Sequence, residues 1–396
     1  MRIFIISRGY PSNKYIMNGI FEYDQAKALS ARGHKVVLIV IDLRSLRRWR
    51  KWGRESLFKD NVHIEAINIP LGRVPKRLLS IFGTLGVNIV YKVCVKKFGK
   101  PDIVHAHFFK IAHYASRGIR NRDVPLIMTE HSADINKDNI KHSDRVIAQF
   151  TYDNVDEIIA VSPSLQIRLQ KTFNKRSFYI PNIVNLDIFK YKPRTIDDNI
   201  FRIVSVGNLI SLKRMDKLIA GFKRFHEHVS NSELVIFGAG SEFNKLKDQI
   251  IQLSLEESVF LKGMTQRLSI AKTLADASCF ILVSSSETFG VAYIEALACG
   301  VPVIATRCGG PEEFIHPGNG ILVPVDDDSA LYNAMKELYS NIYTYDRMLI
   351  AEEIVKKFSP EAVAESLEQK YIEILRGEND NKCPRINQKH DSIGLS

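Results

Sequence analysis

Residues 284–300 read SSSETFGVAYIEALACG and follow directly on the apolar run at residues 280–283. A short, continuous apolar run of this kind predicts a strand that is buried on both faces of a sheet. Gly290 permits a tight turn, and residues 291–299 predict a short helix that Gly300 ends. A buried strand, a polar loop and a helix in this order are typical of an α/β fold with a parallel sheet.

The same alternation recurs through the first half of the sequence. Residues 2–7 and 35–41 are apolar runs that predict buried strands, and residues 21–29 between them predict an amphipathic helix. Further strands are predicted at residues 103–107, 126–129 and 158–161. We therefore predict a Rossmann-like domain over residues 1–190.

The pattern restarts after a polar connector at residues 191–199. Strands are predicted at residues 201–207, 233–238, 259–261, 279–283 and 301–305, with a helix over residues 215–225. This predicts a second Rossmann-like domain over residues 191–358, a last helix at about 359–375 that packs back on the first domain, and a disordered tail at 377–396. Two such doubly wound domains would face each other across a central cleft, where the carboxyl ends of α/β sheets bind ligands.

The composition indicates a globular chain of ordinary kind. The sequence has 396 residues, of which 45% are hydrophobic, enough for two or three domains. The five cysteines lack Cys-x-x-Cys spacing, so we expect neither a disulfide framework nor a zinc site, and we expect a cytoplasmic location. The first apolar run is too short for a signal peptide, and no uninterrupted apolar window reaches the roughly eighteen residues of a membrane span.

A formal net charge of +11 is concentrated in two stretches. The segment that begins at Arg44 and ends at Arg54, RSLRRWRKWGR, holds both tryptophans of the chain, and Arg73, Lys76 and Arg77 precede an apolar run that ends at Phe82. Basic residues interleaved with tryptophan fit anionic lipid, nucleic acid or a solvated face. The repeated basic and apolar arrangement favours an anionic membrane surface, and no nucleic-acid partner is expected.

Two glutamates flank the predicted turn. Glu287 lies on the polar loop, and Glu295 lies about one turn into the helix. The amides of the first helical turn form a phosphate site, and carboxylates accept hydrogen bonds from vicinal hydroxyls. A diphosphate flanked by two polyols is a nucleotide sugar. The alternative is that Glu287 caps the helix and Glu295 faces solvent.

With the GVPVIA sequence at 300–305 behind it, the Glu287-x7-Glu295 pattern resembles the signature of the family 4 retaining glycosyltransferases, which have the GT-B fold. The resemblance is to members of the bacterial surface-polysaccharide type. It extends over most of the chain in order, through residues 10–11, Gly19, 33–34, 102–107, 181–182, 206–207, 237–240, 261–263, 358–361 and Tyr371. Each of these short matches is weak evidence alone, but their occurrence together in this order is specific to the family.

The resemblance implies roles for individual residues. Glu295 would bind the nucleotide ribose, and Glu287 would engage the donor sugar and diphosphate together with the amides of Phe289, Gly290 and Val291. Lys213 would contact the pyrophosphate. Further donor-side positions are Gly19, Gly207, Asn208, Arg214, Gly238, Gly263 and Met264. The family often has arginine at the position of Asn208. Another cation must then neutralise one charge of the diphosphate, and Arg214 is the candidate.

Histidines at the end of a predicted strand mark the other side of the site. The resemblance places His107 near the reacting centre, whereas His105 lies deeper and is expected to be structural. No carboxylate or cysteine cluster accompanies them, so no metal is expected. Glu130 and His131 end another strand and line the acceptor side or serve as local hydrogen-bonding groups. Residues 326–328, all aspartate, are better explained as a helix cap than as a metal site.

These residues predict transfer of a sugar from a nucleotide-diphosphate sugar with retention of configuration, with His107, Glu287 and Lys213 as the catalytic groups and without a metal or other cofactor. The expected acceptor is a saccharide or lipid-linked saccharide at the cytoplasmic face of a membrane, in cell-surface polysaccharide assembly. Two alternatives stay open. One is a nucleotide-sugar 2-epimerase of the same fold, and the other is a non-catalytic scaffold that binds lipid or nucleic acid.

Overall fold

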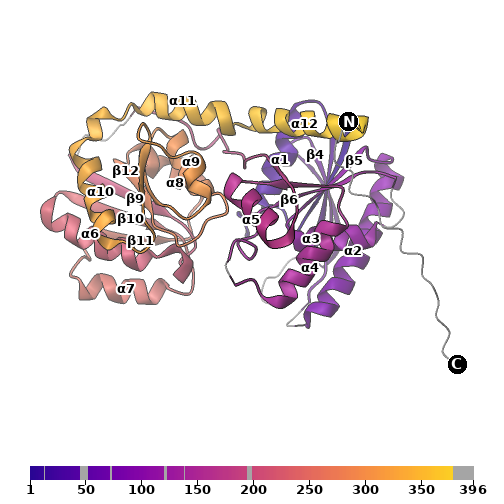
Figure 1. Ribbon diagram of the computed structural model, residues 1–396, viewed down its shortest axis with the longest axis horizontal. Helices are drawn as coiled ribbons and strands as arrows, with labels where there is room; N and C mark the ends of the chain where they lie inside the picture. The colour runs from indigo at the N-terminus through magenta and orange to yellow at the C-terminus, as the bar shows by residue number, and fades with distance from the viewer. Residues whose placement is uncertain are drawn as a thin grey trace.

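Two domains lie side by side in the computed structural model, which describes residues 1–12, 14–44, 52–71, 74–119, 123–137, 139–193 and 199–377. Each domain is built on a sheet of mainly parallel strands (Figure 1). The helices α11 (Arg347–Phe358) and α12 (Pro360–Arg376) run along one side of both domains. The predicted fold class, α/β with two Rossmann-like domains, is confirmed.

The sheet of the first domain has eight strands in the order β3-β4-β2-β1-β5-β6-β7-β8. The strands are β1 (Arg2–Ser7), β2 (Lys35–Asp42), β3 (Gly53–Lys59), β4 (Val62–Asn68), β5 (Ile103–His107), β6 (Leu126–Glu130), β7 (Glu157–Ala160) and β8 (Phe178–Tyr179). Every pair is parallel except β3 with β4, a hairpin that the sequence analysis did not predict. Its turn residues Asp60 and Asn61 both have positive φ, of 51° and 58°, as a two-residue hairpin turn requires.

Helices cover both faces of this sheet. Alternate residues of β1 point to opposite faces, so Phe4 and Ile6 pack against α2 and α3, while Ile3 and Ile5 pack against α1 and α12. The helices of this domain are α1 (Ile20–Ala31), α2 (Lys76–Phe98), α3 (Phe109–Gly118), α4 (His142–Asp153) and α5 (Pro163–Phe173). The last helix, α12, therefore completes the layer that α1 begins.

The helix α2 was not predicted, and it is unusually apolar. By length and composition it is the one helix of the described residues that is apolar enough to cross a membrane, with a mean hydropathy of 1.8 over eighteen residues. Its glycines bring it onto the domain, because a Cβ on Gly83 would lie 2.5 Å from the ring of Tyr114 and one on Gly86 would lie 3.4 Å from Ile41. One face of α2 is thus packed on protein.

The sheet of the second domain has six strands, all parallel, in the order β11-β10-β9-β12-β13-β14. They are β9 (Phe201–Val206), β10 (Ser232–Phe237), β11 (Val259–Gly263), β12 (Cys279–Leu282), β13 (Val303–Thr306) and β14 (Gly320–Val323). The helices are α6 (Met215–His228), α7 (Phe243–Gln252), α8 (Arg267–Ala275), α9 (Val291–Ala298) and α10 (Asp328–Ser340). Asp327 caps α10 by accepting a hydrogen bond of 2.8 Å from the amide of Ala330, so the aspartate run is a helix cap as predicted.

The strand order reverses direction at β1 in the first sheet, where β1 lies between β2 and β5, and at β9 in the second, where β9 lies between β10 and β12. Ligands of open α/β sheets bind beside such points, outside the carboxyl ends of the strands. The carboxyl-end loops of the two domains touch each other, since Asn136 donates a hydrogen bond of 3.0 Å to the carbonyl of Glu287 and Ser162 donates one of 2.6 Å to that of Thr288. The two reversal points therefore open toward one another.

The helix α12 is fixed to the first domain by polar contacts as well as by its core. Tyr371 lies 2.6 Å from Nδ1 of His105, and Arg32 pairs with Glu368 at 2.7 Å. Of the predicted polar connector and tail, residues 194–198 and 378–396 lie outside the described residues. The same holds for residues 45–51 and 72–73 of the two basic stretches.

Candidate active site

The loop after β12 holds the carboxylate of Glu287 inside the second domain. Its Oε1 accepts a hydrogen bond of 2.8 Å from Ser284 and a short one from Nζ of Lys213. The amide of Glu287 bonds the carbonyl of Cys308 at 3.1 Å, so the main chain of the loop is fixed too. Residue Gly290, not Glu287, lies at the N-cap of α9, without a side-chain cap. The alternative in which Glu287 caps this helix is therefore wrong.

Glu295 lies in α9 and is bonded to an arginine. Its Oε1 accepts a hydrogen bond of 2.7 Å from Arg267, the first residue of α8. The same guanidinium lies 3.3 Å from the carboxylate of Asp24, which belongs to α1 of the first domain. All three side chains are about nine-tenths buried, so the alternative in which Glu295 faces solvent is wrong as well.

Burial and charge oppose each other in this triad of Asp24, Arg267 and Glu295. Burial raises the pKa of both carboxyl groups, while the neighbouring guanidinium lowers it in part. Burial acts to lower the pKa of Arg267, but the two carboxylates more than compensate, and its pKa is raised. The triad therefore bridges the domains with one cation between two carboxylates.

The segment after β9 carries the basic residues predicted for the diphosphate. Lys213 ends the short helix η1 (Ser211–Lys213), and its ammonium lies against Glu287. Arg214 follows with a φ of +48°, a left-handed conformation that suits the glycine common at this position. Its guanidinium pairs with Asp326 and lies 3.6 Å from Asp216, so it is already engaged by two carboxylates.

Glycines in this site permit close approaches of the backbone. A Cβ on Gly238, which has a φ of +145°, would lie 1.8 Å from the carbonyl oxygen of Gly207. A Cβ on Gly19, which has a φ of +66°, would lie 2.0 Å from the carbonyl oxygen of Gly9. No other residue fits at either position, because in both the nearest atom belongs to the main chain.

The remaining donor-side residues line the same loops in different environments. Asn208 is exposed, as is Met264, whose exposed fraction is 64%, and Gly263 before it faces open space. Phe289 is buried against Phe314 and anchors the loop that leads into α9. Gly290 and Val291 start α9, where the first amides have no partner within the helix.

Three histidine rings form a stack at the carboxyl ends of β5 and β6. The ring of His107 lies 4.7 Å from that of His105 and 5.2 Å from that of His131, nearly parallel to both. Burial lowers the pKa of His105 and His131 to about 3, and it lowers the pKa of His107 well below its ordinary value. The rings are therefore neutral at physiological pH, and the stack carries no charge.

The two strand histidines differ in their partners. His105 bonds Tyr371 through Nδ1 and Thr129 through Nε2, at 2.6 and 2.7 Å, so it links β5 to α12. His107 bonds His131 through Nδ1 at 2.9 Å, and within the described parts of the chain its buried Nε2 has no hydrogen-bond partner. An unsatisfied buried nitrogen of this kind is a candidate contact for a ligand.

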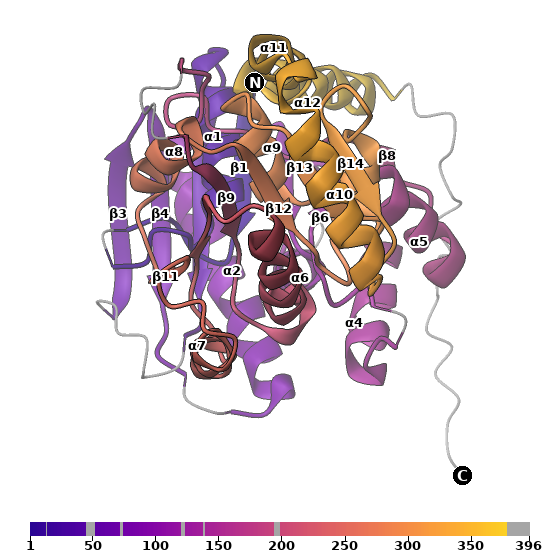
Figure 2. The same cartoon turned by 90° about the vertical axis from the view of Figure 1, so that its left-hand side faces the viewer.

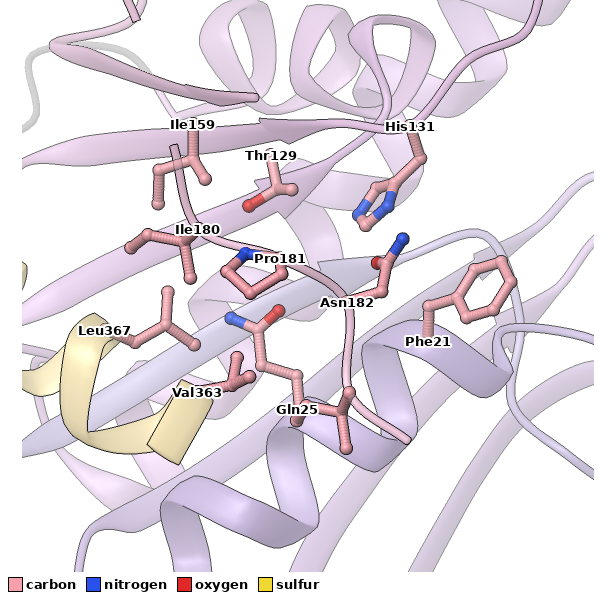
Figure 3. Close-up of a pocket in the computed structure, with 11 residues that line it drawn as sticks. Phe21, Gln25, Thr129, His131, Ile159, Ile180, Pro181, Asn182, Val363 and Leu367 are labelled. Carbon is pink, nitrogen blue, oxygen red and sulfur yellow. The ribbon is translucent and has the colours of Figure 1, made fainter. Parts of the chain in front are cut away.

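Glu130 supports the loop that carries His131. Its carboxylate is fully buried and accepts hydrogen bonds from Tyr152 at 2.7 Å and from the amides of His131 and Ser132 at 3.0 and 2.8 Å. Burial raises its pKa to about 7 despite these bonds. Its observed contacts are thus local ones. His131 also walls a small pocket, roughly the size of one water molecule, between α1, α12 and the loop before Ile183 (Figure 3).

Several residues of the site escaped the sequence analysis. Besides Asp24 and Arg267, these are Asn136, which bonds the Glu287 loop, and Arg8 and Phe108 beside the histidine stack. Phe108 has a φ of +64°, an uncommon conformation for a bulky residue, and the guanidinium of Arg8 lies 4.2 Å from its ring centroid. A phenylalanine gives no sequence signal for a left-handed backbone.

Among the described residues, no group of three or more His, Cys, Asp or Glu side chains is placed to hold a metal ion. Side-chain cations lie beside three of the predicted site residues. Lys213 pairs with Glu287, and Arg267 pairs with Glu295. Arg8 lies near His131; burial is the main cause of the lowered pKa of that ring, and the charge of Arg8 lowers the pKa further.

Models of known protein families match both domains of the chain. The family described as Glycosyltransferase Family 4 matches residues 21–188, and that described as Glycosyl transferases group 1 matches residues 189–353. N-acetyl-alpha-D-glucosaminyl L-malate synthase of Bacillus anthracis is 25% identical over 296 residues, which span 71% of this chain and 77% of that protein. A phosphatidylinositol N-acetylglucosaminyltransferase component of Arabidopsis thaliana is 25% identical, over 78% of this chain and 69% of that protein. The solved structure of sucrose-phosphate synthase from Thermosynechococcus elongatus superposes with a TM-score of 0.79 at 19% identity, covering 95% of this chain and 99% of that one.

Proposed function

The chain belongs to the family 4 glycosyltransferases, retaining enzymes of the GT-B fold that use nucleotide-sugar donors, and we propose that it glycosylates a hydroxyl of a saccharide or lipid-linked saccharide. The observation that carries the proposal is the pair of buried carboxylates, Glu287 and Glu295, at the carboxyl end of the second sheet. Each is oriented by its own cation, so each can accept a hydrogen bond from a sugar hydroxyl in a fixed direction.

On this proposal Glu295 binds the ribose and Glu287 binds the donor sugar. Lys213 has three ammonium donors, of which one goes to Glu287, so the others can meet the diphosphate. The amides of the first turn of α9, at the positive end of the helix dipole, can bind the same diphosphate. As the glycosidic bond breaks, its electron pair moves to the leaving diphosphate, and these groups stabilise the charge that develops.

The acceptor side is assigned to the first domain. The acceptor oxygen attacks the anomeric carbon on the face from which the diphosphate departs, and its proton passes to a phosphate oxygen of the leaving group. No side chain is needed as a nucleophile. His107 is neutral and can bond a donor hydroxyl through Nε2, with its ring held by the bond to His131.

We assign the enzyme to cell-surface polysaccharide assembly at the cytoplasmic face of a membrane. Support comes from the basic character of the chain, with a net charge of +11, and from a relative whose name includes phosphatidylinositol. Family members typically need no metal, so the side-chain cations named above are assigned the role of charge neutralisation.

The first test is a thermal-shift series with UDP, GDP and ADP, each with and without EDTA. We expect one nucleotide to raise the melting temperature in the presence of EDTA, and Glu295→Gln to remove that shift. Glu257→Gln, at an exposed residue in the turn between α7 and β11, is the matched control and should keep it. If none of the nucleotides binds, the scaffold alternative replaces the proposal.

The second test identifies the reaction. The protein is incubated with the sugar conjugate of the nucleotide that binds, and products are followed by NMR. Transfer to a saccharide with the anomeric configuration of the donor supports the proposal. Release of free epimerised sugar without an acceptor identifies the epimerase alternative instead.

A further inference from the structure

The outward face of α2 carries apolar side chains that the described parts of the chain leave about half exposed. Five large side chains on this face are between 37% and 53% exposed; they are Leu78, Ile81, Phe82, Leu85 and Ile89. Their spacing of three, four, seven and eleven residues places them on one side of a helix. They form a stripe about 16 Å long at 1.5 Å per residue. We call these five residues the α2 stripe.

The opposite face of α2 is equally apolar but packed. Val87, Val90 and Cys94 are buried against the first sheet, and Asn88 bonds the carbonyl of Gly118 in α3. A helix that is apolar all round is normally covered all round. Here the described residues cover mainly one side, and only 28% of the most apolar window of α2 is buried.

Charge points to what covers the other side. The sequence of α2 contains five basic residues and no acidic one, with Lys76 and Arg77 before the stripe and Lys92, Lys96 and Lys97 after it. Lys76 and Lys97 pair with Asp144 and Glu65 of the domain itself. The stripe is thus bounded by cations at both ends, as in helices that lie in the headgroup region of anionic bilayers.

We propose that the α2 stripe docks the first domain on an anionic lipid bilayer. The helix lies in the plane of the membrane surface, with Ile81, Leu85 and Ile89 inserted among the acyl chains and Arg77, Lys92 and Lys96 at the phosphates. This inference rests on the proposed function in one respect, because a membrane surface is where a lipid-linked acceptor is found.

The contacts of α2 favour an interfacial over a spanning helix. Ser80 bonds His113 of α3 at 3.1 Å, and Lys76 bonds Asp144 of α4 at 3.2 Å. Leaving the domain would break these bonds and open the core at Gly83 and Gly86. In Figures 1 and 2, α2 lies at the lower edge of the first domain, opposite α11 and α12, so a bilayer can approach it without meeting those helices.

A second copy of the chain is a poorer occupant of the stripe. A symmetric dimer through α2 would bring two sets of like charges together, because each stripe is bounded by cations alone. Anionic lipid removes this repulsion. The like charges at both ends therefore decide in favour of the membrane.

The test is flotation of the full-length protein with vesicles of phosphatidylcholine, with and without phosphatidylglycerol. We expect binding to the phosphatidylglycerol vesicles only, weakened by high salt. Ile81→Ser/Leu85→Ser/Ile89→Ser should lower the bound fraction about tenfold or more. The matched control is Ile251→Ser/Met348→Ser/Leu349→Ser on α7 and α11, where the three side chains are 51%, 50% and 58% exposed, and it should bind like the wild type.

A charge variant separates the two contributions. Arg77→Gln/Lys92→Gln/Lys96→Gln should weaken binding and remove most of its salt dependence. All variants are checked for a single cooperative melting transition and for an unchanged shift with the nucleotide that binds, since nucleotide binding does not involve the stripe. Failure of the proposed function would abolish the nucleotide shift in the wild type, whereas failure of this inference would not.

Three results would overturn the inference. One is flotation of the stripe variant at the level of the wild type. Another is equal binding of the wild type to vesicles with and without phosphatidylglycerol. The third is a dimer, measured by light scattering, that the stripe variant converts to a monomer while no protein floats.

Discussion

Replacing Arg267 by methionine should destabilise the protein in a way that depends on pH. The guanidinium lies 2.7 Å from Glu295 and 3.3 Å from Asp24, and all three side chains are about nine-tenths buried. Methionine keeps most of the volume but leaves two buried carboxylates without their cation. Little packing is therefore lost, and the change in melting temperature reports mainly on the loss of the positive charge.

The magnitude follows from the location of the triad. Removing one partner of a buried ion pair typically costs about 3–5 kcal/mol. The lower end, about 3 kcal/mol, applies here, because Asp24 and Glu295 come from different domains and water reaches them if the domains separate. For domains of this size, 1 kcal/mol corresponds to about 2–4 °C, so the melting temperature should fall by about 6–12 °C near neutral pH.

The raised pKa values determine how this destabilisation changes with pH. Burial already raises the pKa of Asp24 and Glu295, and loss of Arg267 removes the group that lowers it. A carboxyl group whose pKa is higher in the folded state binds protons more readily when folded, so stability rises as pH falls toward that pKa. The difference in melting temperature between Arg267→Met and wild type should therefore shrink between pH 8 and pH 5.

Differential scanning calorimetry at several pH values tests this reasoning. Lys245→Met is the control, because its side chain is 75% exposed and its pairing with Glu242 should contribute little. Adding Asp24→Asn to Arg267→Met should restore part of the loss, since one unpaired carboxylate is removed. A fall in melting temperature that is the same at every pH, or no fall at all, would refute the electrostatic account of the triad.

Two further predictions concern close packing, and a third concerns the anchoring of α12. Gly238→Ala should destabilise the second domain by about 2 kcal/mol or more and abolish the nucleotide-induced thermal shift, because its Cβ would lie 1.8 Å from the carbonyl oxygen of Gly207. Gly263→Ala, at a φ of +67° but with open space around it, should cost only about 1 kcal/mol. Tyr371→Phe removes the bond to His105 and should lower stability by about 1–2 kcal/mol while amide exchange in α12 speeds up; unchanged exchange would contradict the anchoring role of this bond.

Ten of the fourteen strands of the described residues were predicted, because each is a short apolar run, a pattern that depends only on neighbouring residues; the short strands β8 and β14 were missed. The β3–β4 hairpin could not be predicted, because β3 is mostly exposed and mixes charged with apolar residues. The helix α2 was missed for a different reason. Its apolar residues lie on two faces, which removes the periodicity by which amphipathic helices are recognised.

The site was predictable where it is contiguous in sequence. Glu287, Glu295 and Gly290 lie within one strand, loop and helix, so their relation could be inferred from spacing. The partners of the glutamates could not be inferred in the same way. Arg267 precedes Glu295 by 28 residues, and Asp24 precedes Arg267 by 243, so only the folded chain brings them together.

The two glutamates differ in what fixes them, and this difference bears on the reaction. The carboxylate of Glu287 is held by Ser284 and Lys213, both of the second domain, whereas Asn136 of the first domain bonds its main-chain carbonyl. Glu295 is held by an arginine that is shared with Asp24, so its orientation depends on the approach of α1. If Glu295 binds the ribose as proposed, contact with the nucleotide is coupled to the contact between the domains. Binding of the donor and assembly of the acceptor side would then be one event, which limits wasteful hydrolysis of the donor.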